Sequence, residues 1–106
     1  MDTFSAIAEP TRRAILEMLA RRGPLSATQI YESFDATHPA ISQHLKVLRE
    51  ANLVLVEKRG QQRIYHLNPV GLAELRGYVE GLWDDVLRAF GEEAERMAQA
   101  GVKNEE

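Results

Sequence analysis

Apolar residues recur three or four positions apart in several stretches before residue 52, and each stretch is predicted to be a helix. The first is short and covers residues 4–8. The second runs from Pro10 to Gly23. Proline suits a first helical turn, because the N–H that it lacks would be unpaired there in any case, and glycine suits the residue that follows a helix.

Two further helices are predicted close together. The third covers residues 27–34 and has a strong start signal, because Ser26 and Gln29 stand at the spacing of a capping box. The fourth begins after Thr37 and ends at Asn52, a residue type that tolerates the left-handed backbone found after many helices. Its apolar side chains recur at i, i+4 and i+7 and therefore face the core: Ile41, Leu45 and Leu48.

The period changes from helix to strand after Asn52. Residues 53–56 and 64–67 are largely apolar, and the polar stretch between them contains Gly60, which predicts a β-hairpin with a basic tip. A final helix runs from about Val70 into the high nineties. The order of helix, helix, helix, helix, hairpin and helix predicts a mainly α fold with a β-hairpin, the winged helix-turn-helix.

The last helix carries more apolar surface than one small domain can bury. Its first stripe is Leu75, Val79, Leu82 and Val86, and its second is Trp83, Leu87, Phe90, Ala94 and Met97. One stripe is expected to cover the core and the other to pair with a second copy, and either assignment is open. Gly77 and Gly81 fit either the close approach of another helix or simple tolerance. The residues predicted for the homodimer interface are Phe4, Ile7, Tyr78, Trp83, Leu87 and Phe90.

Of the 106 residues, 44% are hydrophobic and 27% charged, so residues 1–106 are predicted to form one domain with a frayed tail over about 101–106. No apolar run approaches the ~18 residues that a membrane span needs, and the protein is expected in the cytoplasm.

The absence of cysteine excludes a disulfide framework, a thiolate metal site and a cysteine nucleophile. No catalytic constellation stands out, so we expect no enzyme, no cofactor and no metal site.

Charge is distributed unevenly along the chain. The net charge is −3, but residues 1–69 hold nine Lys and Arg against seven Asp and Glu, whereas residues 70–106 hold four against nine. A polyanion such as double-stranded DNA is therefore expected to approach the middle of the chain rather than its last third.

Two polar surfaces are the predicted DNA contacts. The start of a helix such as the fourth reaches base edges in the major groove, and cations on a hairpin tip suit phosphates or the minor groove. An ordinary solvated helix face and a charged turn are the alternatives. His44 and His66 are expected to be partly buried structural residues. The predicted recognition-helix residues are His38, Pro39, Ser42, Gln43 and Lys46, and the predicted wing residues are Lys58, Arg59, Gln61, Gln62 and Arg63.

Three segments give the chain a family resemblance: EPTRRAIL at 9–16, THPAISQHLKVLREANLV at 37–54 and RIYHL at 63–67. Over residues 3–67 the chain resembles the ArsR-type winged-helix transcriptional regulators. The resemblance implies a homodimeric DNA-binding repressor whose first and last helices form the dimer interface. It also implies that the helix after Thr37 is the recognition helix.

The chain lacks the metal motifs of many such regulators, which use Cys pairs in the third helix or Asp and His sets in the last. Residues 27–34 contain no Cys and the last helix contains no His, so no metal response is predicted. The operator is expected to be an inverted repeat, and an unknown small-molecule effector would act at the dimer interface. The alternative function is a winged-helix module that binds another protein, but such a module should be apolar on its recognition face.

Overall fold

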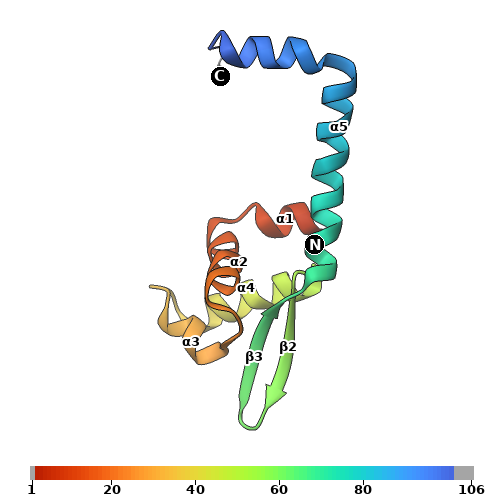
Figure 1. Cartoon of the computed structure of the whole chain (residues 1–106). Helices are drawn as coiled ribbons and strands as arrows, with labels where there is room; N and C mark the ends of the chain where they lie inside the picture. Colours follow the sequence, from red (N-terminus) through yellow and green to blue (C-terminus); the bar gives the residue numbers. More distant parts are fainter. Residues whose placement is uncertain (1, 102–106) are drawn as a thin grey trace. The chain divides into compact units, whose positions relative to one another are not determined.

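The structure, a computed structural model, describes residues 2–101, and the chain divides into two compact units, Met1–Ala73 and Glu74–Glu106. Its elements follow one another in the predicted order (Figure 1). The mainly helical fold with a β-hairpin is therefore confirmed. The helices are α1 (Thr3–Ile7), α2 (Pro10–Arg22), α3 (Ala27–Glu32), α4 (His38–Glu50) and α5 (Pro69–Gln99), and the strands are β1 (Leu25–Ser26), β2 (Val54–Arg59) and β3 (Gln62–Leu67).

The helices start at residues whose side chains cap them. Glu9 caps α2, because its Oε2 accepts a hydrogen bond from the backbone N–H of Arg12 at 2.9 Å. Ser26 and Gln29 form the predicted capping box at the start of α3, with hydrogen bonds of 3.2 and 2.9 Å. Thr37 caps α4 in the same way. These caps satisfy backbone N–H groups that a helix leaves without partners.

Left-handed backbone follows α2 and α4, as predicted. Gly23 follows α2 with φ 81°, and Asn52 lies just beyond α4 with φ 64°. The third helix ends at Glu32 rather than at residue 34. The chain can therefore turn sharply between α2 and α3, and again between α4 and the hairpin.

The hairpin is longer than predicted and belongs to a three-stranded sheet. Strands β2 and β3 pair as far as Arg59 and Gln62, on either side of a turn that contains Gly60 with φ 63°. Strand β1 pairs with the other edge of β3, which gives the order β1-β3-β2. This strand is not predicted from the sequence, because two residues are too few to show a strand period.

The core of the first unit lies between α2, α3, α4 and the base of the hairpin. Its members all lie within residues 6–72. The three α4 side chains predicted to face inward are each at most 1% exposed, which confirms the orientation of that helix. The largest side chains with less than 2% exposure are Ile15, Ile30, Ile41, Leu45, Leu48, Leu53 and Val54.

The first turn of α5 is fixed to the turn that follows α4. The Asn68 side-chain amide donates hydrogen bonds to the backbone oxygen of Asn52 at 3.0 Å and to its Oδ1 at 2.9 Å. Asn68 Oδ1 in turn accepts from the backbone N–H of Val70 at 3.1 Å. A Cβ added to Gly71 would lie 1.9 Å from the backbone oxygen of Asn52, so only glycine fits at this position.

The second unit is helical as far as Gln99, with a break at Phe90, where φ is −142° and ψ is 19° (Figure 1). This break is not predicted, although Gly91 follows it and glycine is common at kinks. Residues 102–106 of the predicted frayed tail lie outside the described residues. No helix of residues 2–101 is long and apolar enough to cross a membrane.

Both apolar stripes of α5 are largely exposed. In the first stripe Val79, Leu82 and Val86 are 39–54% exposed, and in the second Trp83, Leu87 and Phe90 are 42–64% exposed.

Gly71→Ala is expected to lower the free energy of unfolding by at least about 1–3 kcal/mol, the usual cost of overpacking, because the new methyl group would collide with Asn52. Urea unfolding followed by circular dichroism measures the change. Gly77→Ala is the control: its added Cβ would meet nothing within 4 Å, and alanine is favoured over glycine in a helix by about 1 kcal/mol. A Gly71→Ala protein as stable as wild type would contradict the close approach.

Candidate nucleic-acid interface

The outward face of α4 carries the predicted recognition residues. All five of them are exposed, whereas the inward face of the helix is buried in the core. They begin in the first turn of the helix, the part that enters a DNA groove in helix-turn-helix proteins. These residues are His38, Pro39, Ser42, Gln43 and Lys46.

Tyr31 of α3 orients two of these side chains. Its ring stacks on the imidazole of His38, with centroids 4.3 Å apart and planes 13° from parallel. Its hydroxyl forms a hydrogen bond of 2.7 Å with Ser42 Oγ. Tyr31 is not among the predicted site residues, because a contact between neighbouring helices has no signature in either helix alone. Tyr31 therefore limits the rotamers of His38 and Ser42 in the protein without a bound ligand.

A groove of about 210 Å³ lies between α3, α4 and β3. Three cations line it: Lys46 and Arg49 from α4, and Arg63 from the wing. Within residues 2–101 neither arginine makes an ion pair, and Lys46 lies 4.0 Å from Glu50. Arg49 is not among the predicted DNA contacts, and its position beside Arg63 appears only in the folded chain. Unpaired cations in a groove are suited to DNA phosphates.

A second groove, of about 290 Å³, continues along the wing. Gln61, Gln62 and Arg63 line it together with Thr28 of α3. Arg63 therefore lines both grooves. The structure brings these three wing residues next to α3 and brings Arg63 next to α4.

The strand register places the wing cations on opposite faces. Lys58 lies opposite Arg63, and this pair shares a face with Val56 and Tyr65, whose side chains pack on or in the core. Arg59 lies opposite Gln62 on the other face. The five predicted wing residues thus do not form one continuous surface.

Glu57 neutralises much of the charge of Arg59. Its Oε1 accepts hydrogen bonds from Arg59 Nε and an Nη at 3.1 and 2.9 Å, and its Oε2 lies 3.2 Å from His66 Nε2. The hydrogen bonds and charge of Arg59, followed by those of His66, hold the pKa of Glu57 below its ordinary value. The carboxylate is therefore ionised and available to compete with a phosphate for Arg59.

Comparison with known proteins finds similar regulators. A family model described as a helix-turn-helix domain matches residues 7–57. The HTH-type transcriptional regulator Rv2034 of Mycobacterium tuberculosis is 42% identical over 89 residues, which span 84% of this chain and 82% of that protein. The transcriptional repressor SdpR of Bacillus subtilis is 38% identical over 73 residues, which span 69% and 80%.

A solved structure agrees with these relatives. The crystal structure of a "possible transcriptional regulator for arsenical resistance" has 42% sequence identity and a TM-score of 0.71, over 78% of this chain and 85% of that one. The chain belongs to the ArsR family of winged-helix transcriptional regulators. This ArsR-family chain is a DNA-binding regulator and not an enzyme, as the sequence predicts.

The histidines of this ArsR-family regulator have protein partners. His44 and His66 are both half-buried, as predicted, and they contact Arg12 and Glu57, respectively. Over residues 2–101 no group of three or more His, Cys, Asp or Glu side chains is placed to hold a metal ion.

Arg63→Ala is expected to weaken binding of this ArsR-family regulator to a random-sequence DNA duplex much more than Arg59→Ala, because Arg59 is already paired with Glu57. Losing one phosphate contact should also flatten the dependence of log affinity on log salt by about one unit. Fluorescence anisotropy with a labelled duplex at several KCl concentrations measures both effects.

Glu57→Gln is the matched test of this pairing. It leaves Arg59 in place without its carboxylate, so binding should become tighter than in wild type. Equal losses in the Arg59→Ala and Arg63→Ala proteins, or no gain in Glu57→Gln, would contradict the conclusion that Glu57 neutralises the charge of Arg59.

Proposed function

We propose that this ArsR-family chain is a homodimeric, sequence-specific repressor that acts in the cytoplasm on an inverted-repeat operator. The observation that carries the proposal is the exposed start of α4 beside a groove lined by three cations. Side chains that reach base edges and cations that hold phosphates are the two parts of sequence-specific DNA binding. The name of one relative, a transcriptional repressor, supports repression as the outcome.

The side chains of the interface have different roles in this proposal. Gln43 reads a base edge, because a glutamine amide can bond adenine at two atoms. His38 and Ser42, held by Tyr31, contact the same groove with restricted rotamers. Lys46 contacts phosphate together with Arg49 and Arg63. The polar character of this surface disfavours the alternative function, a module that binds another protein.

The apolar side chains of α5 support the homodimer. At about 100° per residue the two stripes of α5 adjoin and form one broad apolar face. Burial of each large side chain contributes about 1.5–3 kcal/mol, and a patch of this kind marks an interaction site. In α1, Phe4 is 48% exposed and Ile7 is half-buried. We propose that α1 and α5 of two copies pair through Phe4, Ile7, Tyr78, Trp83, Leu87 and Phe90.

A dimer of this kind suits the proposed operator. Two recognition helices related by a twofold axis enter successive major grooves about 34 Å apart, so the half-sites form an inverted repeat. An unidentified small-molecule effector that shifted the two copies at this interface would change that spacing and release DNA. We propose that metals are not the signal, since α3 contains no Cys and α5 no His.

Selection of binding sequences from a pool of random duplexes tests the proposal. It should enrich an inverted repeat, and Zn²⁺, Cd²⁺ or arsenite at low micromolar concentration should leave affinity for the enriched duplex unchanged. Enrichment of no sequence, or of a single unrepeated half-site, would contradict the proposal, as would release by any of these metals.

Gln43→Ala should relax the preference for one base pair in each half-site of the selected operator, at a cost of about 1–3 kcal/mol for the preferred base. Affinity for random-sequence duplex should be nearly unchanged, because no phosphate contact is lost. Titration of operators with each base at every position measures the loss. If Gln43→Ala weakens operator and random duplex equally, Gln43 is not a base reader.

Sedimentation at micromolar concentration should show a dimer of wild-type chains and a shift toward the 12.0 kDa monomer in the Trp83→Ala, Leu87→Ala double variant. Both side chains lose apolar area that the interface would bury. Leu55→Ala is the control, because Leu55 is an equally exposed apolar residue on β2. A monomeric wild type would end the dimer proposal, and a fully dimeric double variant would exclude this face of α5.

A further inference from the structure

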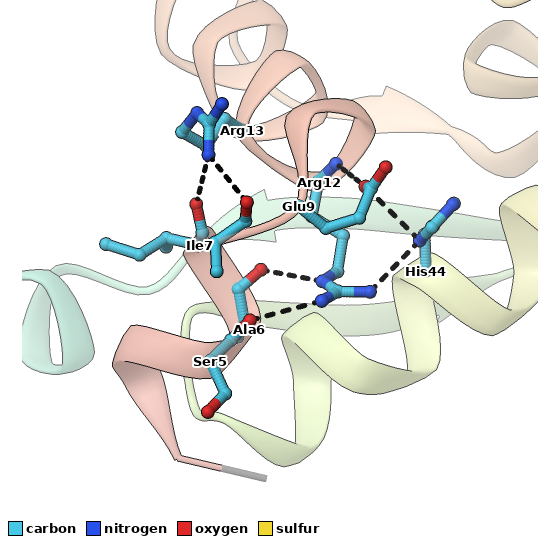
Figure 2. Close-up of polar contacts among 8 residues, drawn as sticks. Ser5, Ala6, Ile7, Glu9, Arg12, Arg13 and His44 are labelled. Carbon is cyan, nitrogen blue, oxygen red and sulfur yellow. Dashed lines mark hydrogen bonds and ion pairs between the residues drawn. The ribbon is translucent and has the colours of Figure 1, made fainter. Parts of the chain in front are cut away.

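Arg12 of α2 holds the end of α1. Its Nε donates a hydrogen bond to the backbone oxygen of Ala6 at 2.6 Å, and one Nη donates to that of Ser5 at 3.1 Å (Figure 2). Backbone carbonyls at the end of a helix have no partner within the helix. Arg12 therefore adds partners at this helix end, where the backbone oxygen of Ser5 also accepts from the backbone N–H of Ala8 at 3.2 Å.

Arg13 binds the same end of α1 in a similar way. One of its Nη atoms donates to the backbone oxygens of Ile7 and Ala8 at 2.7 and 3.0 Å. Figure 2 shows the two guanidinium groups on different sides of this helix end. Arg12 and Arg13 thus both attach the end of α1 to α2 by hydrogen bonds to backbone oxygens.

Only one of the two arginines also contacts α4. The second Nη of Arg12 lies 3.3 Å from Nδ1 of His44, on the recognition helix α4 (Figure 2). The His44 side chain is 22% exposed and directly follows Gln43, the proposed base reader. The hydrogen bonds of Arg13 end on backbone oxygens of residues 7 and 8. Arg12 thus joins the end of α1 to α4.

Glu9 lies on the other side of this contact. Its Oε2 is 3.7 Å from His44 Nδ1 and also caps α2. Burial raises the pKa of Glu9, but the net shift is downward, chiefly because the carboxylate accepts hydrogen bonds from the backbone N–H groups of Arg12 and Thr11. The ionised carboxylate and the guanidinium together confine the imidazole.

The hydrogen bond selects one form of His44. A guanidinium can only donate, so Nδ1 must accept and the ring proton of neutral His44 must lie on Nε2. The imidazole therefore has a defined tautomer as well as a defined position. Both can be observed in the protein without DNA.

We propose that Arg12 is a positioning residue that couples the attachment of α1 to the placement of the recognition helix through His44. The coupling rests on the proposed function, in which α1 belongs to the dimer interface and α4 reads the operator. A change in how two copies pair would then move α1, and Arg12 would carry that movement to α4 beside Gln43.

The test compares Arg12→Gln with Arg13→Gln. Each removes a guanidinium from the end of α1, so both should lower the melting temperature by similar amounts. Arg12→Gln alone should lower the ratio of affinities for the selected operator and a scrambled duplex, by about ten-fold. An equal fall of that ratio in both variants would overturn the proposal, because the effect would then come from α1 alone.

Substitutions at His44 complete the test. Glutamine can accept a hydrogen bond from Arg12 whereas leucine cannot, so His44→Gln should keep the ratio and His44→Leu should reproduce the loss. Combining His44→Leu with Arg12→Gln should add little to either single loss, as expected for two residues that act through one contact. Fully additive losses would overturn the coupling.

An NMR measurement separates failure of this proposal from failure of the proposed function. The ¹⁵N shifts of the His44 imidazole in free protein report its tautomer. They should show protonated Nε2 in wild type and Arg13→Gln, and a mixture of tautomers in Arg12→Gln. Wild-type protein that selects no sequence but shows these shifts would refute the proposed function and keep the contact. Identical shifts in all three proteins would refute the contact.

Discussion

Burial of one side of α4 is the constraint on which the rest of the interface depends. Ile41, Leu45 and Leu48 are almost fully enclosed by α2, α3 and the base of the hairpin. Rotating the helix about its axis would expose all three, at about 1.5–3 kcal/mol for each side chain. The outward direction of the polar residues between them follows from that cost, so the core decides which side chains α4 presents to solvent.

Burial sets the rotation of α4, and polar contacts set the details of its surface. Tyr31 restricts His38 and Ser42 at the start of the helix, and Arg12 holds His44 at its flank. Each contact joins α4 to a different neighbour, α3 on one side and α2 on the other. A side chain that is already confined loses less entropy when it binds, so these contacts prepare the surface for a ligand.

The parts of the structure that the sequence predicts are those with local causes. Helix starts at Ser26 and Thr37 depend on groups within three residues, and the turn at Asn52 depends on the conformational tolerance of one residue type. Contacts between elements have no such signal: Tyr31 and Ser42 are 11 positions apart, and Arg12 and His44 are 32. Alternate residues share a strand face, so a strand that continues to Arg59 places Glu57 beside Arg59. The predicted strand ends at residue 56 and therefore does not include this pair.

Net charge is a poor guide to what this chain binds, because the acidic residues neutralise cations in some places and not in others. In α5, Arg76, Arg88 and Arg96 each form an ion pair with an acidic residue three or four positions away. Every arginine or lysine among the described residues of the second unit is therefore paired. Arg49 and Arg63 line one groove of the first unit without such partners within residues 2–101. A phosphate responds to charges within about 10 Å at ordinary salt. The positive field that it meets is therefore that of the groove, whatever the sign of the whole chain.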